Sequence, residues 1–230
     1  MNSNMKDKKY TLNQFFAVVL VIILPSLFSS LNAQLMIGGG VNSIVAFGVK
    51  KPYFGLQIQV EKRDEDQSFY GKISSTLSQK EDDMLITLDP IDETKSQLDV
   101  PTHITYNYTN LEFGKRYYYG DDIDFGYSFF GGSHITLTFN QLRLVTSSYD
   151  KNQYIFPSAQ ATRGSIFGLA AGLNGGIQKG YYFGTIYVDA GLNYYLRAIP
   201  SNDLASYTSS FKSVNFVFNL GFKRTLHYSN

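Results

Sequence analysis

The chain has 230 residues, a formal net charge of +1 at neutral pH and no cysteine. The missing cysteine excludes disulfide-stabilised folds and thiolate metal sites, and the balanced charge leaves no basic surface for nucleic acid. Charged residues make up 17% of the sequence, against about 25% in ordinary soluble domains. Tyr and Phe supply all of the 16% aromatic content, since Trp is absent.

The first 33 residues have the pattern of a secretory signal peptide. Three lysines precede an apolar run at 15–24, and small residues before Gln34 offer a cleavage site. The run is shorter than the about 20 apolar residues that a transmembrane helix needs. We therefore predict a signal peptide at 1–33 and one outer-membrane β-barrel domain at 34–230, with an uncleaved anchor as the alternative.

Beyond residue 34, apolar residues alternate with small or polar ones in one segment after another. Phe54, Leu56, Ile58 and Val60 form such a stripe. Alternation with a period of two predicts β-strands. Eight strands are expected, at 35–47, 53–63, 68–79, 102–117, 123–139, 163–178, 181–197 and 213–228.

The connections between these segments alternate in length. Short turns are expected at 64–67, around Gly120-Asp121 and around Lys179-Gly180, whereas long loops span 80–101, 140–162 and 198–212. Short periplasmic turns and long extracellular loops are typical of bacterial outer-membrane barrels. The pattern predicts an all-β fold, a closed antiparallel transmembrane β-barrel with both termini periplasmic. A hairpin within 141–156 is expected to extend the strands at 123–139 and 163–178, and the alternative is that it raises the count from eight strands to ten.

Two faces are distinguished along each predicted strand. The non-apolar face of 163–178 carries Gly, Ala, Asn and Gln rather than Lys and Glu, which fits a narrow lumen better than a soluble lipocalin-like barrel. Aromatic residues near the strand ends predict two girdles at the membrane interfaces. The girdle residues are Phe69, Tyr70, Tyr117, Tyr118, Tyr119, Tyr181, Tyr182, Phe183, Tyr194, Tyr195 and Tyr228.

Several charged residues fall on the predicted lumen face. Arg116 and Asp124 are symmetric about Gly120 and should face each other, and Lys72 should lie beside Glu112. Buried charges need partners, so we expect a salt-bridged plug, with a gate or proton path as the alternative. The predicted lumen charge network consists of Lys72, Glu112, Arg116, Asp124, Asp189, Arg197 and Lys223.

The whole of 34–230 resembles the small eight-stranded outer-membrane barrels, the OmpA transmembrane domain and OmpX. The leader ending in Asn32-Ala33 before Gln34, and the Tyr- and Asn-rich strands, resemble outer-membrane proteins of Bacteroidota. The resemblance implies a place in the cell outer membrane of a Gram-negative bacterium. It also implies that outer-membrane lipid is a partner, and it allows another outer-membrane or periplasmic protein as a second partner.

No catalytic or cofactor-binding constellation stands out in the sequence. The stretch 227–230 resembles the His-x-Ser-Asn motif of barrel lipid A deacylases, which take an acid from a later strand that this sequence does not supply. Loop 80–100, with net charge −5 from seven acidic and two basic residues, matches no calcium-binding spacing. We expect a non-enzymatic barrel without metal or cofactor, whose extracellular loops bind a partner or which docks in a larger secretion or uptake assembly. A lipid A-modifying enzyme and a narrow channel are the alternatives.

Overall fold

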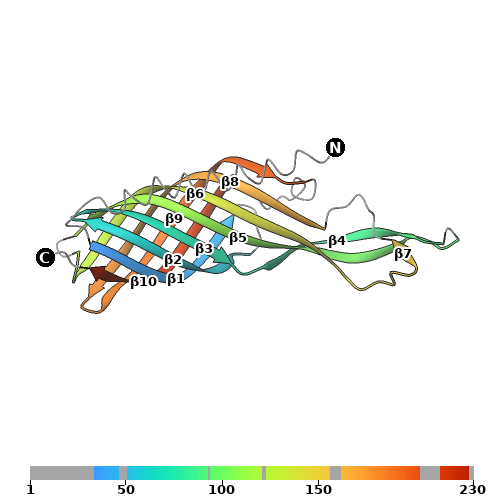
Figure 1. Ribbon diagram of the computed structural model, residues 1–230, viewed down its shortest axis with the longest axis horizontal. Coiled ribbons are helices and arrows are strands. Elements are labelled where there is room, and N and C mark those ends of the chain that lie inside the picture. The colour runs from blue at the N-terminus through green and yellow to red at the C-terminus, as the bar shows by residue number, and fades with distance from the viewer. Residues whose placement is uncertain are drawn as a thin grey trace.

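The computed structural model describes residues 34–46, 51–92, 94–120, 123–155, 162–202 and 213–227. This part of the chain folds into one antiparallel sheet of ten strands (Figure 1). No helix in it is long and apolar enough to cross a membrane. The strands are β1 (Gln34–Ala46), β2 (Tyr53–Asp64), β3 (Gln67–Thr76), β4 (Gln79–Pro90), β5 (Leu98–Tyr119), β6 (Tyr127–Thr146), β7 (Tyr154–Ile155), β8 (Arg163–Tyr181), β9 (Gly184–Pro200) and β10 (Val214–His227).

Eight of these strands close a barrel. The neighbours run in the order β3-β2-β1-β10-β9-β8-β6-β5, and β3 pairs with β5 to complete the ring. Closure leaves no unpaired backbone edge on the ring, which is what a sheet surrounded by lipid requires. The predicted closed, eight-stranded antiparallel barrel is confirmed.

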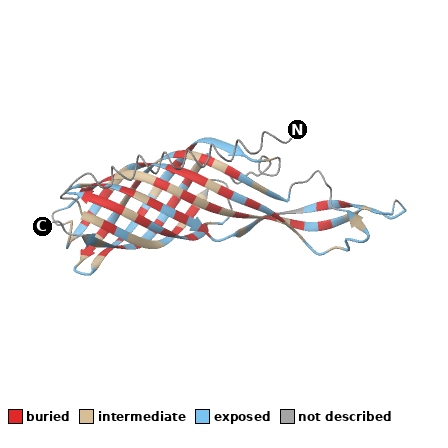
Figure 2. Cartoon of the chain, in the orientation of Figure 1, coloured by how far each residue is buried: buried red, intermediate tan, exposed pale blue. Residues whose placement is uncertain are grey.

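The period-two alternation of each strand separates the two faces of this barrel. On β2 the outward Phe54, Leu56 and Ile58 are 56%, 66% and 64% exposed, whereas Gln57 and Gln59 between them are buried. Figure 2 shows the same alternation of buried and exposed residues on the other strands. The barrel therefore has an apolar outer wall and a polar interior.

One end of the barrel carries three short turns, and we call it the short-turn end. Its turns join β2 to β3, β5 to β6 and β8 to β9, and the start of β1 and the end of β10 lie beside them. Two turn positions expected from the sequence are wrong. The second turn is centred near Asp124 rather than Gly120, since Tyr119 pairs with Phe129. The third follows Tyr181, because Gly180 still pairs within the sheet.

Gly180 shows why that turn begins later than expected. Its backbone N–H donates to the carbonyl oxygen of Gly126 at 3.0 Å, and a Cβ at this position would overlap the carbonyl oxygen of Asp124. Gly180 is thus required by the close approach of the neighbouring turn. Gly184, with a positive φ of 148°, supplies the left-handed residue of the β8–β9 turn itself.

The opposite end of the barrel extends into an arm, visible on the right of Figure 1. The arm consists of β4, residues 98–106 of β5, the end of β6, β7 and the segment between β6 and β7. β4 pairs with β5 beyond the point where β3 leaves it, so it lengthens the sheet without widening the ring. The predicted extension of the 123–139 strand also forms, since β6 continues to Thr146, opposite Thr102.

Candidate functional site

The polarity of the sheet reverses along β5, between the arm and the barrel. In the arm and at the mouth of the barrel the buried face of β5 is mostly apolar, from Val100 to Tyr108, and the other face carries polar residues such as Asn107. Beyond Thr109 the pattern is opposite, with Leu111 and Phe113 on the outer face and charged residues on the inner face. β6 reverses at the paired positions, where Phe139 precedes Gln141 on the outside. The reversal therefore falls at the same level on these two neighbouring strands.

A guanidinium group lies at the centre of the barrel interior. Arg116 is fully buried, and its Nη1 and Nη2 lie 3.3 Å from Glu61 and 3.4 Å from Asp189. Its planar group stacks over the ring of Tyr70 at 3.9 Å from the ring centroid. Lys223 Nζ donates to Glu61 at 2.9 Å. Each charge in this cluster is therefore neutralised by a direct contact.

A second buried ion pair lies beside this cluster. Lys72 Nζ is 3.0 Å from Glu112, its register partner on β5. Tyr70 donates its hydroxyl proton to Glu112 at 2.6 Å and accepts a hydrogen bond from Asn174 at 2.7 Å. His134 hydrogen-bonds to Asn193 on its far side at 2.5 Å. Tyr70 joins the two ion clusters, because its ring also lies under Arg116.

We call Glu61, Lys72, Glu112, Arg116, Asp189 and Lys223 the lumen network. All six side chains are at most 4% exposed, and the three acidic groups balance the three basic ones. An ion crossing this interior would have to break contacts whose loss leaves charges unpaired at low dielectric. The six side chains therefore fill the centre of the interior with paired charges.

Two residues expected in this network lie elsewhere. Asp124 is in the turn, 43% exposed, and forms an ion pair with Arg63 instead of Arg116, which sits opposite Gly132. Arg197 is exposed on the last part of β9, which lies away from the short-turn end. A β-bulge causes this second difference, because β9 has one extra residue between the partners of Leu169 and Ala170, and the alternation shifts there.

The expected aromatic girdle is divided between the two faces. Tyr70, Tyr118 and Tyr195 point into the barrel, where they are 2%, 3% and 8% exposed, so their assignment to a membrane girdle is wrong. All three have polar contacts inside; Tyr118, for example, donates to Glu61. Tyr228 lies outside the described residues. The residues on the outer face or in the turns are Phe69, Tyr117, Tyr119, Tyr181, Tyr182, Phe183 and Tyr194.

Glu61 is the central residue that the sequence analysis missed. It contacts Arg116, Lys223 and Tyr118, and it is fully buried. The signal was present, because the outward stripe from Phe54 to Val60 places position 61 on the inner face.

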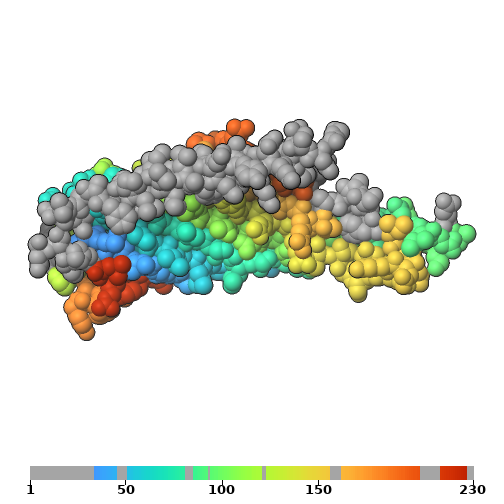
Figure 3. Space-filling view, viewed as in Figure 1, coloured from blue at the N-terminus to red at the C-terminus, as the bar shows by residue number. Residues whose placement is uncertain are grey.

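The arm has an apolar core of its own. Ile86, Leu88, Val100, Ile104 and Leu144 are buried together there, in one cluster with residues at the mouth of the barrel. Tyr149 and Tyr154, from the segment after β6, pack against them. In Figure 3 the arm projects well beyond the barrel as a continuous body.

The tip of the arm is polar and hydrogen-bonded. Ile91 donates its backbone N–H to the carbonyl of Gln153 at 2.8 Å, which joins the β4–β5 turn to the segment after β6. Thr94 donates its hydroxyl and its backbone N–H to Asp92, at 2.7 and 3.0 Å, and these bonds lower the pKa of the Asp92 carboxyl. The tip therefore presents ordered, charged carboxylates to solvent.

Within the residues that the structure describes, no group of three or more His, Asp or Glu side chains could hold a metal ion. His134 is part of the interior, and His103 lies on the arm. The backbone of His227 pairs with Leu35 at the end of β10, and the residues that follow it lie outside the described part.

Comparison with known proteins shows similarity in structure but not in sequence. No protein-family model matches the chain, and no curated protein matches it by sequence. A major outer membrane protein from Thermus thermophilus aligns with a TM-score of 0.50 and 12% identity, over 84% of this chain and 99% of that one. The Thermus match shows that this chain has the fold of an outer-membrane β-barrel, and it shows the fold alone.

Two further solved structures align less closely. Neisserial surface protein A (NspA) gives a TM-score of 0.48 at 9% identity, over 83% of this chain and 95% of that one. Ail, the attachment invasion locus protein of Yersinia pestis, gives a TM-score of 0.41 at 10% identity, over 84% and 98%.

Proposed function

We propose that this protein is a non-enzymatic integral barrel of the bacterial outer membrane that presents its arm as a binding surface. The partner would be a molecule outside the cell or another protein of an outer-membrane secretion or uptake assembly. The observation that carries the proposal is the reversal of polarity on β5 and β6, which separates a lipid-facing barrel from a water-facing arm.

The reversal supports membrane insertion because each region buries the kind of side chain that the proposed surroundings, lipid or water, would solvate poorly. Where the outer wall is apolar, the interior is polar and its central charged side chains form ion pairs, as expected for a sheet in lipid. Where the outer face is polar, the interior is apolar, as expected in water. The name of the Thermus protein also points to an outer membrane.

The arm is suited to binding because it is a rigid body built beyond the membrane boundary. Loops positioned by a rigid scaffold are where binding residues commonly lie. Here the scaffold is extended by continued strand pairing and by an apolar core around Leu88 that continues into the mouth of the barrel. The orientation we propose puts the arm outside the cell and the short-turn end, with the first and last strand ends, in the periplasm.

The test is to shorten the arm and ask which partner is lost. Replacing residues 85–101 by Asn-Gly would keep β4 and β5 paired from Gln79 to Met84 and remove the tip. Tagged full-length and shortened proteins are purified from native outer membranes in mild detergent and compared by mass spectrometry. A protein recovered in stoichiometric amount only with the full arm supports the proposal.

The matched control alters the opposite end of the barrel. Asp66 lies in the β2–β3 turn, so an Asp66→Asn variant should recover the same partner as the unaltered protein. If the shortened protein keeps every partner and every cellular phenotype of the full chain, the arm is not the working surface and the proposal fails.

A further inference from the structure

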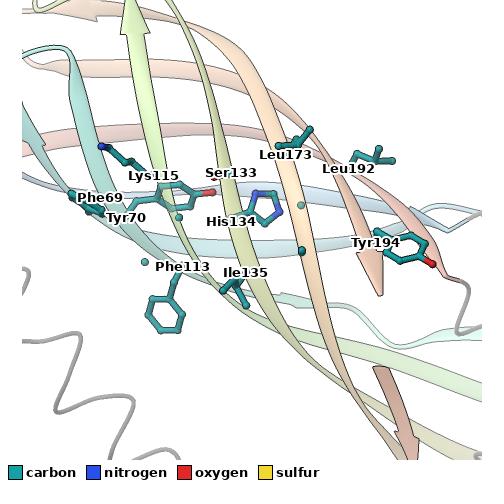
Figure 4. Close-up of a pocket in the computed structure, with 14 residues that line it drawn as sticks. Phe69, Tyr70, Phe113, Lys115, Ser133, His134, Ile135, Leu173, Leu192 and Tyr194 are labelled. Carbon is teal, nitrogen blue, oxygen red and sulfur yellow. The ribbon is translucent and has the colours of Figure 1, made fainter. Parts of the chain in front are cut away.

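A groove crosses the outer wall of the barrel on the side formed by β3, β5, β6, β8 and β9. It has a volume of about 750 Å³, which is within the range of ligand sites (Figure 4). One row of outward side chains follows the strand pairing along it. That row is Phe69, Lys115, Ser133, Leu173 and Leu192.

Small side chains make the wall hollow at this place. In the next row of paired outward residues, Gly71 and Ala171 are small and stand on either side of Phe113 and Ile135, and Ser133 is the small residue of the first row. Large side chains stand at the sides, since Phe69 and Leu173 are 54% and 65% exposed. The result is a long apolar depression bordered by aromatic and aliphatic groups.

The groove runs obliquely away from the short-turn end. Lys115 is four residues from that end of β5, Ser133 is six residues from it on β6, and Leu173 is eight residues from it on β8. Because each strand residue advances about 3.4 Å, the groove deepens into the apolar wall as it passes from β5 to β8. Lys115 lies close to its shallow end, beside Phe69, which is two residues from the start of β3.

Lys115 is an unusual residue for a lipid-facing wall. Its Nζ lies 5.4 Å from the ring centroid of Phe69 and 4.6 Å from that of Tyr117. Among the described residues, no carboxylate lies within ion-pair distance of it. A lysine on this face is tolerated near the membrane interface, where its ammonium can reach the headgroups. It therefore offers an anion-binding group at the mouth of an apolar groove.

We infer that this groove binds one phospholipid of the leaflet at the short-turn end. The phosphate accepts hydrogen bonds from Lys115 Nζ, and one acyl chain lies over Ser133 and Ala171. A phospholipid is the occupant because one positive charge stands at one end and the rest of the lining is predominantly apolar. The inference depends on the membrane insertion proposed above and is independent of what the arm binds.

The test measures retention of a defined lipid by the full chain in detergent micelles. Palmitoyl-oleoyl-phosphatidylglycerol is titrated into the protein, and native mass spectrometry counts the bound lipid. We expect one lipid to bind in preference to any further ones, with Lys115→Gln weakening it about tenfold, the loss expected for one charge-assisted bond. Ala171→Phe, which fills the groove, should abolish the preferred site. Dioleoylglycerol, which lacks phosphate, should bind as weakly to the unaltered protein as phosphatidylglycerol does to Lys115→Gln.

Two matched controls lie on the same wall. Lys179 is also held between tyrosine rings near the short-turn end but lies outside the groove, and Ala190 is an exposed outward alanine outside it. Lys179→Gln and Ala190→Phe should keep the preferred lipid, and unboiled gel mobility confirms that every variant is folded. Equal lipid retention by Lys115→Gln and Lys179→Gln overturns the inference. So does a protein dimer that disappears in Ala171→Phe, because the groove would then be a contact between two copies. Either failure leaves the arm-shortening test unaffected.

Discussion

The interior of the arm and the interior of the barrel are lined by the same sheet, but one is filled with apolar side chains and the other with polar ones. β5 passes through both, with buried Ile104 and Tyr106 in the arm and buried Glu112 and Arg116 in the barrel. In water, apolar side chains gain by packing together, and they hold the arm closed. In lipid there is no such gain, because the surroundings are as apolar as the side chains, and polar contacts must close the interior. The kind of side chain in each interior therefore indicates whether water or lipid lies outside it.

The sharpest test of this comparison locates the membrane boundary on β5. Single cysteines can be introduced without background, since the chain contains none. At Thr105 and Asn107 a water-soluble maleimide should label the protein in vesicles almost completely, because these outward positions lie above the boundary. At Leu111 and Phe113 labelling should stay near background. Similar labelling at all four positions would show that no membrane boundary crosses β5 there, and it would contradict the proposed insertion.

The next largest effect is expected from the centre of the lumen network. Arg116→Met leaves Glu61 and Asp189 buried without their shared partner, and breaking such a pair costs about 3–5 kcal/mol. The free energy of unfolding, measured by urea titration in phospholipid vesicles, should fall by that amount. Arg143→Met, on the exposed face of β6, is the control and should change it little. A loss below about 1 kcal/mol for Arg116→Met would mean that the network does not hold the barrel.

The corresponding change in the arm should act locally. Leu88 is fully buried in the arm core, and Leu88→Ala should lower the free energy of local opening by about 2–4 kcal/mol. Amide hydrogen exchange should accelerate across β4 and residues 98–106, while unfolding of the barrel stays as it was. Leu85→Ala, at a 67% exposed position of β4, is the control. Equal effects on arm and barrel would show that the two regions form a single cooperative unit.

The barrel could be read from the sequence because its signal is repeated on every strand. Period-two alternation fixes both the strands and their faces, so the stripe from Phe54 to Val60 also determines where Glu61 points. Strand ends were harder to place, because alternation at Ile123 and Phe125 continues through a turn. Arg197 could not be placed, since the bulge before it is set by pairing with β8 and leaves no local mark.

The arm was partly hidden by its own composition. Residues 80–100 carry a net charge of −5, which is typical of a solvated loop, yet Ile86 and Leu88 alternate with polar residues as in a strand. Charges on the water-facing side do not oppose pairing when the other side packs against a core. The partners of β4, Tyr149 and Tyr154, lie more than 55 residues further along the chain, and no local pattern could reveal them.

The smallest expected effect distinguishes Tyr70 from Tyr117, which the sequence alone assigned to the same aromatic girdle. Tyr70→Phe removes a hydroxyl that donates to Glu112 and accepts from Asn174, so unfolding should become easier by about 1–2 kcal/mol. Tyr117→Phe, on the outer face of β5, should change stability by less than about 0.5 kcal/mol, because its hydroxyl faces the interface. The ring of Tyr70 and its contact with Arg116 remain in the variant, so the difference measures the hydroxyl alone. If the two variants lost equal amounts of stability, the hydroxyl of Tyr70 would not stabilise the interior. Lys72 would then be the one strong partner of Glu112.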